Sequence, residues 1–463
     1  MNIIPKGMGK DNAIMKCCEK FLKRFQVNSL LRQVGATKEK GIPAYEIFAF
    51  LLGIIFSKKN LYTLLSDPKE QLSFSKDTVY RFLNKASVNW HMFVFLLSCS
   101  IVGFVKTLTS EERKSAIIVD DTAYYRDRSK KVELLSRFKD HSKNRYYKGF
   151  TLLNAGWSDG QTYLPLDYRL LANAEGKELL EGSHIKEDNR TLATRRRKEA
   201  RTEKPKLVLD MLRRIKGTLA QARYVLFDSW FCSPSLILSI KGLGYDVVAR
   251  MKNNDNFRYR FKGELIPISK IYGKCPKRRG RSKHLLSVTV EVCHKEFKET
   301  VPAKIVFVRD KGDGNKWIAL ISTDTTMSED EIIALYGKRW QIEPFHQTIK
   351  SFLGLEKEFQ GRSFDAISAH TAIVMARYLL LSLENRENKD LRSVNEGFRV
   401  LCDELEDISF SFAFELIVSA ISQSSSEFLF MDKQRIDAFI EHFISCLPPF
   451  IKEKLRPTAC VIA

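Results

Sequence analysis

Apolar residues recur at helical spacing through the first part of the chain. The runs EIFAFLLGIIF (46–56) and WHMFVFLLSCSIVGFV (90–105) follow this pattern, and turn residues such as SDP (66–68) separate the segments. The pattern predicts that residues 1–108 are helical.

A short polar helix is expected within this region. In SFSKDTVYRFLNKAS (73–87), Ser75 can cap a helix that carries polar residues such as Asp77 and Arg81 beside apolar ones. A short helix after a turn is typical of the recognition helix of a helix-turn-helix, and also of an ordinary amphipathic helix. Both interpretations are compatible with the sequence.

From about residue 114 the pattern changes to short β-like runs. In order, the segments predict a strand (114–125), a hairpin around the turn SDG (149–171), a basic helix-prone stretch (190–217), a strand (222–230), a helix (233–244) and a strand (245–252). Strands followed by β–α–β alternation predict a mixed α/β sheet.

The alternation breaks at residue 253 and returns at residue 317. Between them lie β-like pieces around a basic loop, and after them come a strand (317–324) and a helix that opens with a capping box of Ser328 and Glu331. We therefore expect a helical N-terminal domain (1–108), a core in two parts (109–252 and 317–385), a β-rich insertion (253–316) and a helical C-terminal region (386–463).

Composition indicates a polyanionic partner. The chain has 76 Lys and Arg against 55 Asp and Glu, a formal charge of +21. This excess favours nucleic acid, although an acidic membrane surface would suit the same charge.

Nine scattered cysteines form no C-x2-C pair, which favours reduced thiols over a zinc site or a disulfide framework. The apolar runs fall short of the ~18 residues of a membrane span, so we expect a cytoplasmic protein with no membrane partner.

The stretch YGKRWQIEPFHQTIK (336–350) carries the most specific polar pattern. On a helix, Tyr336, Arg339, Glu343 and Lys350 would lie within about 60° of one another, along one stripe. One acid with two cations suits a metal-bound phosphodiester, whereas a solvated face with an Arg–Glu pair is the plainer interpretation. Pro344 predicts a kink close to the acid.

Aspartates that follow apolar strands could complete such a site. Asp120 and Asp121 end the run IIVDD, and Asp228 follows YVLF. Open α/β sheets place their ligands at this edge of the strands, although each Asp could also be a turn or cap residue.

Together these motifs resemble those of the DDE transposases of bacterial insertion sequences. The likeness is to the insertion-sequence-four family, whose Y-x2-R-x3-E-x6-K signature is met at all four positions of 336–350. IIVDDT resembles the family's first-aspartate motif D-x-T, and FDSWF its second. The resemblance covers about residues 114 to 385. It implies an RNase H-like mixed-sheet catalytic core interrupted by a β-rich insertion and flanked by helical regions.

The resemblance also implies the roles of individual residues. Asp120, Asp228 and Glu343 would be the catalytic and metal-binding acids, with Asp121 as the alternative first acid, because strand alternation lets only one of the pair face the site. The signature residues Tyr336, Arg339 and Lys350 would contact DNA phosphates. Trp340 occupies the signature's tryptophan position, and Trp230 is a weaker candidate for stacking on a displaced base.

Metal ions would carry the chemistry. Two Mg²⁺ ions, for which Mn²⁺ can substitute, would activate water and then a 3′-hydroxyl. His346 is either a further ligand or proton shuttle, or a histidine on the helix surface.

Two basic clusters lie outside these motifs, at residues 190–206 and 274–283. Either could be a solvated loop or a phosphate contact, and we favour DNA contact for the second. Its candidate residues are Lys277, Arg278, Arg279 and Arg281.

The expected function is therefore cut-and-paste DNA transposition. The protein would bind the terminal inverted repeats of its element through the N-terminal domain, act as a homodimer on double-stranded DNA, and join the cut ends to target DNA. The alternatives are a catalytically inactive DNA-binding protein derived from a transposase, and an RNase H-like nuclease without joining activity.

Overall fold

A computed structural model gives the fold of the chain. It describes residues 13–38, 40–57, 75–110, 112–140, 144–173, 176–186, 188–278, 283–310, 316–358, 361–387 and 433–447, with the single residues 394, 414, 417, 418 and 421. The predicted SDP turn therefore lies outside the described residues, as does most of the predicted C-terminal region.

Helices make up the N-terminal part of the chain. They are α1 (Ala13–Arg24), α2 (Val27–Gln33), α3 (Ala44–Gly53), the 3-10 helix η1 (Ile54–Ser57), α5 (Lys76–Leu83) and α6 (Trp90–Thr107). The predicted short polar helix is α5, which buries Val79, Phe82 and Leu83. Ser75 stands at its N-cap position, but its side chain accepts no amide hydrogen bond there. An amphipathic helix at this place is confirmed, and a role in reading DNA stays a prediction.

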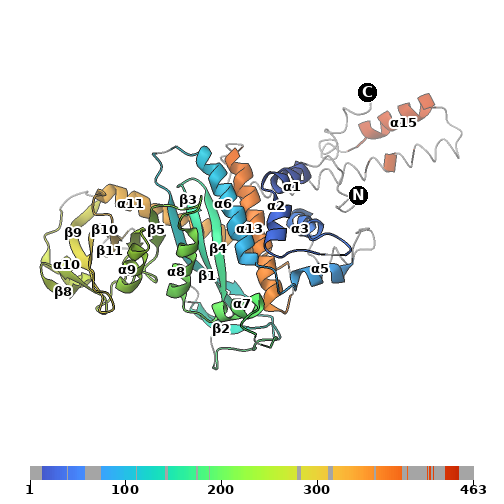
Figure 1. Cartoon of the computed structure of the whole chain (residues 1–463). Helices are drawn as coiled ribbons and strands as arrows, with labels where there is room; N and C mark the ends of the chain where they lie inside the picture. The colour runs from blue at the N-terminus through green and yellow to red at the C-terminus, as the bar shows by residue number, and fades with distance from the viewer. Residues whose placement is uncertain are drawn as a thin grey trace.

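One mixed sheet forms the centre of the molecule (Figure 1). Its first strands are β1 (Ala116–Tyr125), β2 (Ser136–Asp140), β3 (Arg145–Ser158), β4 (Tyr163–Leu171), β5 (Tyr224–Phe227) and β6 (Asp246–Arg250). The predicted hairpin is confirmed as the antiparallel pair β3–β4, and β1 pairs with β3 in the same sense. On its other side β1 pairs parallel with β5, which pairs parallel with β6. The spatial order β4-β3-β1-β5-β6 is that of an RNase H-like fold.

Helices connect and cover these strands. Between β4 and β5 come α7 (Leu192–Ala200) and α8 (Lys204–Ile215), and α9 (Pro234–Gly242) links β5 to β6. Ser233 caps α9, and Pro234 follows at its first position, where the missing amide hydrogen costs nothing. The resulting β5-α9-β6 unit is the expected β–α–β alternation.

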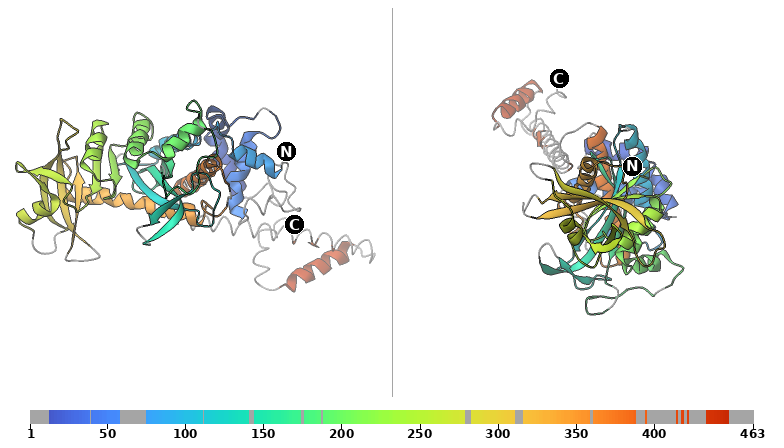
Figure 2. Two further views of the ribbon diagram at one scale, coloured as in Figure 1. Left: turned by 90° about the horizontal axis from the view of Figure 1, so that it is seen from below. Right: turned by 90° about the vertical axis from the view of Figure 1, so that its left-hand side faces the viewer.

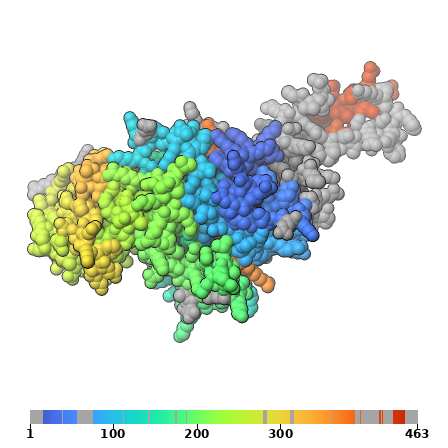
Figure 3. Space-filling view, in the orientation of Figure 1, coloured from blue at the N-terminus to red at the C-terminus, as the bar shows by residue number. Residues whose placement is uncertain are grey.

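The segment between β6 and β11 extends the same sheet. It contains β7 (Arg258–Phe261), β8 (Glu264–Pro267), α10 (Ile268–Lys274), β9 (His284–Val292) and β10 (Val301–Arg309), and β11 (Trp317–Ser322) returns beside β6. The eleven-stranded sheet therefore continues through β11, β10, β9, β7 and β8. Figures 2 and 3 show this part at one end of the molecule, with the N-terminal helices beyond the other side of the core.

The long helix α13 (Phe364–Glu387) lies in the core of the molecule. Every residue from Phe364 to Leu383 is buried, and the helix packs against α3, α5, α6, α12 (Ile342–Ser351) and β4. By length and apolar composition α6 and α13 could each cross a membrane, which corrects the expectation that the apolar runs are too short. Both lie mostly inside the fold, as core helices of a globular protein do. Helix α15 (Lys433–Ser445) lies apart from the sheet (Figure 1).

Candidate active site

Two of the predicted acids come from neighbouring parallel strands. In the β1–β5 pairing, Ala116 lies opposite Tyr224 and Ile118 lies opposite Leu226. Two residues further along this register, Asp120 on β1 comes beside Asp228, the first residue after β5. Residues in register on parallel strands project to the same face of the sheet, so the two carboxyl groups are neighbours. Asp228 is held in place by the Trp230 amide, which donates to its Oδ1 at 2.9 Å.

Strand alternation separates Asp120 from Asp121. Asp120 Oδ2 lies 3.2 Å from Nη1 of Arg339, on the face of the sheet that carries the signature helix. Asp121 projects to the other face, where its Oδ2 lies 2.7 Å from Nζ of Lys204 on α8. The structure therefore places Asp120, and not Asp121, with the signature residues.

Arg339 joins the first acid to the third. Its Nη1 lies 3.2 Å from Asp120 Oδ2 and also 3.4 Å from Oε1 of Glu343. The guanidinium is almost fully buried, whereas the Glu343 side chain remains 44% exposed. Asp120 on β1 and Glu343 on α12, more than 200 residues apart in the sequence, thus belong to one cluster, with the Arg339 cation between them.

The signature stretch is not one continuous helix. It begins in α11 (Glu329–Gly337), which opens with the predicted capping box of Ser328 and Glu331, passes through a 3-10 turn, η2 (Lys338–Gln341), and continues as α12. The four side chains therefore do not lie on one regular α-helix, and an irregularity stands close to the acid, as Pro344 predicts. Pro344 has no amide hydrogen for the carbonyl of Trp340, so regular α-helical bonding cannot run through η2 into α12.

The two strand acids are poorly solvated and close to each other. Burial, followed by the nearby charge of Asp228, raises the pKa of Asp120 to about 7. Burial also raises the pKa of Asp228. Shifts in this direction mean that the charge of Arg339, which lowers both pKa values, does not offset the burial of the carboxyl groups. Such carboxyl groups are typical of functional sites.

A divalent cation suits this pair by charge and by ligand type. Carboxylate oxygens are the ligands that Mg²⁺ prefers, and a cation would remove the repulsion that raises the pKa of Asp120. Across the described residues, no three His, Cys, Asp or Glu side chains lie close enough together to hold a metal ion. Glu343 is instead paired with Arg339. The residues therefore fit a cation at Asp120 and Asp228, with Glu343 able to join only by leaving Arg339.

The other signature residues surround this cluster. The Tyr336 ring centre lies 5.8 Å from Arg339 Cζ, and the Trp340 ring centre lies 5.7 Å from the same atom. Trp340 is 65% exposed, as a side chain that meets a partner would be. Lys350 lies further along α12, where its Nζ donates to Thr122 Oγ1 at 2.7 Å. Contacts of these residues with DNA stay predictions.

His346 is not a surface histidine. It is 6% exposed and faces β3, where its Nε2 lies 3.2 Å from Nδ2 of Asn154. Burial, with the charges of Lys350 and Arg339, lowers the pKa of His346 to about 3. The imidazole is therefore neutral at ordinary pH, and its Nε2 contacts the side-chain amide of Asn154.

Sequence reasoning missed two residues beside the acids. Asn154 lies directly across from Asp120 in the β1–β3 pairing, and its buried Oδ1 has no hydrogen-bond partner in the described chain. A lone polar residue inside the apolar run FTLLNAGW was the available signal. Lys204 pairs with Asp121, and its Nζ also lies 4.3 Å from the centre of the Trp230 ring. The half-exposed Trp230 is therefore covered by a cation.

The first basic cluster is partly buried, whereas the described candidates of the second are exposed. In the first, Arg196 and Arg197 are buried, and Arg197 forms ion pairs with Glu133 and Asp365. DNA contact by these two is excluded, because their charges are already paired inside the protein. In the second, Lys277 and Arg278 are exposed, and the other two candidates, Arg279 and Arg281, lie outside the described residues.

Comparison with known proteins gives three findings. Residues 47–313, more than half of the chain, match a family described as DDE superfamily endonuclease. The matched segment contains Asp120 and Asp228 and ends before Glu343. No curated protein matches the sequence. Among solved structures, the piggyBac transposase synaptic complex with hairpin DNA is similar at 12% identity and a TM-score of 0.43, over 92% of this chain and 84% of that one. A likeness at this level carries no argument about activity.

Proposed function

Because the chain belongs to the DDE superfamily of endonucleases, we propose that it is a DNA transposase of the insertion-sequence-four type. It would bind the terminal inverted repeats of its element, cleave the DNA there and transfer the cut strands to a target. One observation supports this above the others. Asp120 and Asp228 lie in register on neighbouring parallel strands, and Arg339 links Asp120 to Glu343.

Asp120, Asp228 and Glu343 are the residues that would hold the metal. Two Mg²⁺ ions, or Mn²⁺ in their place, would supply activation of water and of a 3′-hydroxyl, and would stabilise charge at phosphorus. For Glu343 to reach the ions, its pairing with Arg339 must loosen. A DNA phosphate is a suitable new partner for Arg339, since a guanidinium binds phosphate and carboxylate in the same geometry. DNA binding would thus release the third acid.

The remaining signature residues would position the DNA. Lys350 is held by Thr122, two residues after Asp120 on the same face of β1, so its charge lies beside the strand that carries the first acid. Exposed Trp340 offers a flat apolar surface next to the cluster. Neutral His346 and Asn154 pack beneath the acids and would keep α12 and β3 in register.

A nuclease that cuts without joining is the second candidate. The matched family is described by endonuclease activity alone, and the acid cluster would serve hydrolysis equally well. Strand-transfer product from an end that has been cut beforehand would exclude this alternative. Sedimentation of the protein on end-containing DNA would test whether it acts as a homodimer.

Substitution of each acid tests the proposal. We expect Asp120→Ala, Asp228→Ala and Glu343→Ala to reduce Mg²⁺-dependent cleavage of element-end DNA to background while leaving end binding nearly intact. Asp121→Ala is the matched control, because it removes a neighbouring carboxylate that faces the opposite side of the sheet. Full cleavage by Asp228→Ala would contradict the proposal, and loss of cleavage in Asp121→Ala alone would assign the first acid to that residue.

A further inference from the structure

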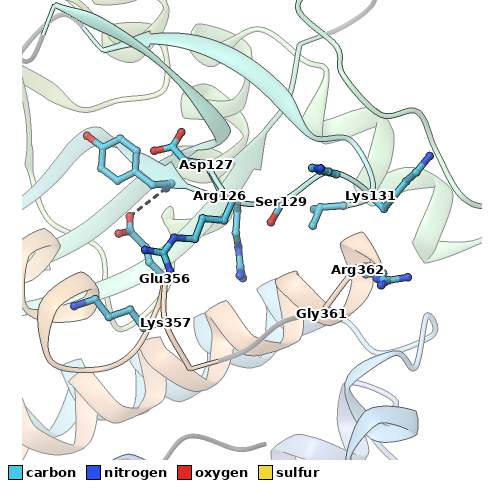
Figure 4. A pocket seen from close by; sticks show the side chains of 12 residues that line it. Arg126, Asp127, Ser129, Lys131, Glu356, Lys357, Gly361 and Arg362 are labelled. Atoms are coloured by element: carbon cyan, nitrogen blue, oxygen red, sulfur yellow. Dashed lines mark hydrogen bonds between the residues drawn. The ribbon is translucent and has the colours of Figure 1, made fainter.

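A basic pocket lies beyond the end of β1 (Figure 4). Its volume is about 940 Å³, and it is formed by the loop after β1 and the loop after α12. We call it the basic pocket and define it by its charged lining residues, which are Arg126, Asp127, Arg128, Lys130, Lys131, Glu356, Lys357 and Arg362. Six of these are Lys or Arg and two are acids, so the pocket is strongly positive.

Both acids of the pocket are engaged by other groups. Oε1 of Glu356 accepts the Tyr125 amide hydrogen at 3.1 Å, as the dashed line in Figure 4 shows. Oδ1 of Asp127 accepts the Lys148 amide hydrogen at 2.9 Å, and its Oδ2 lies 3.9 Å from Arg145. Within the described residues, no ion pair is formed between these two carboxylates and the exposed Lys and Arg side chains of the lining. The charge of these exposed side chains is therefore not neutralised by the acids of the pocket.

Four cations of the pocket are available to a ligand. Within the described part of the chain, the exposed side chains of Arg128, Lys130, Lys357 and Arg362 form no ion pair. Two come from the loop after β1 and two from the loop after α12, so an anion between the loops would meet positive charge on both sides. Exposed cations that converge on a cavity without acidic partners favour an anionic ligand.

The walls of the pocket are fixed by the buried core. The amide of Glu133 donates to the carbonyl of Arg362 at 2.9 Å, which ties one loop to the other. The Glu133 carboxylate is itself bound by buried Arg197, with both oxygens at 2.7 Å. On the opposite wall, buried Glu358 pairs with Arg377 of α13 at 2.8 Å. These contacts hold the described parts of both walls against the core before a ligand binds.

The pocket continues from the acid cluster along β1. Asp120 and Tyr125 lie on the same strand, five residues and thus about 17 Å apart. Lys350 stands between the two sites, because its Nζ bonds Thr122 and lies 5.5 Å from the Tyr125 ring centre. A single DNA strand advances by about 3.4 Å per charge, so roughly five nucleotides would span this distance.

We propose that the basic pocket binds the phosphodiester backbone of the DNA strand that runs from the acid cluster past Lys350. This inference rests on the proposed function and adds a second contact site to it. Among the described residues of the lining, Tyr125, which is partly buried, is the one aromatic side chain. Long, flexible Lys and Arg side chains without aromatic surfaces for stacking are suited to bind DNA phosphates and not DNA bases. The contact is therefore independent of the DNA sequence.

The test removes two pocket charges and measures binding without cleavage. The probe is a labelled duplex carrying the DNA that flanks the coding gene, titrated with the full chain in EDTA across a series of salt concentrations. For the pocket variant Lys130→Ala/Lys357→Ala we expect severalfold weaker binding and a salt-dependence slope that is shallower by about 1.8. Each lost phosphate contact accounts for about 0.9 of that change.

The charge-matched control is Arg213→Ala/Lys216→Ala. Both residues are exposed at the C-terminal end of α8, and α8 covers the opposite face of the sheet from Arg339, as the Asp121–Lys204 pair shows. We expect wild-type affinity and slope for this variant, and unchanged thermal unfolding midpoints for both variants. Equal slopes for the wild type and the pocket variant would overturn the inference while leaving the proposed function intact. A wild-type protein that neither binds nor cleaves the duplex would overturn both.

Discussion

At the scale of single residues, the site is defined by which side of a strand a carboxylate faces. Asp120 and Asp121 are chemically identical neighbours, yet one lies beside Arg339 and the other beside Lys204. Burial and the proximity of Asp228 raise the pKa of Asp120, so its ionised form costs the folded protein free energy. A structural role alone gives no reason to retain a carboxylate with this cost.

The raised pKa of Asp120 predicts a pH-dependent stability difference. Between the unfolded pKa near 4 and the folded value of about 7, the folded state binds more protons, so its stability falls as pH rises through this window and then levels off. The Asp120→Asn variant has no carboxyl group at this position and so lacks this pH dependence. Its free energy of unfolding, relative to that of the wild type, should therefore rise by up to a few kcal/mol between about pH 4 and pH 8, at about 1.4 kcal/mol per unit of pKa shift. Urea unfolding of both proteins in metal-free buffer measures the difference. A difference that does not change with pH would contradict the assignment.

At the scale of elements, the pairing of β1 with β3 fixes the position of β1, which carries Asp120 and leads into the basic pocket. Gly149 lies where β3 passes nearest to β1, opposite Tyr125 and with φ of +152°. A Cβ atom there would come within 2.0 Å of the Tyr124 carbonyl oxygen. The residue is therefore required to be glycine by both its backbone angle and the space beside it.

Gly149→Ala should destabilise the protein strongly. The clash is with backbone, which cannot move aside without breaking the pairing of β1, so we expect a loss of roughly 3 kcal/mol or more. Gly182→Ala is the control, since nothing lies within 4 Å of its Cβ position, and it should change stability by less than about 0.5 kcal/mol. Thermal and urea unfolding of the two variants measure both effects. Similar stability of the two variants would show that β1 and β3 pair less closely than described.

At the scale of the whole molecule, buried ion pairs connect distant parts of the chain to α13. Arg377, in the middle of this apolar helix, binds Glu358 and the carbonyl oxygens of Leu51 and Leu52. Near the start of the helix, Asp365 binds Arg197 of α7. The charged residues of α13 thus have partners only when the N-terminal helices and the core are assembled around it, and unpaired they would be costly in any apolar medium.

This packing predicts that α13 does not enter membranes despite its composition. We expect the full chain to stay in the supernatant after high-speed centrifugation without detergent, and not to float with neutral phosphatidylcholine vesicles, because α6 and α13 are already covered by protein. Binding to anionic vesicles that disappears at high salt would reflect the net charge of +21 and not insertion. Salt-resistant flotation with the neutral vesicles would contradict the prediction.

The main elements and the candidate acids could be predicted from the amino-acid sequence. The hairpin β3–β4, the β5-α9-β6 unit, the capping box and the break near Pro344 follow from local periodicity and local hydrogen bonding, which need only neighbouring residues. The sequence also indicated Asp120, Asp228 and Glu343, because acids at strand ends and the spacing of the signature can be recognised without a structure.

Which side chains contact one another could not be predicted from the sequence, because it depends on the folded core. Four features depend on the register between strands and on contacts between residues far apart in the sequence. They are the opposite orientations of Asp120 and Asp121, the position of Arg339 between two acids, the burial of His346 and Arg197, and the basic pocket. A sequence pattern describes only the neighbours that a residue has along the chain. Pairing across the sheet and against α12 is set by packing of the whole core, where a shift of one residue would exchange the two faces of β1.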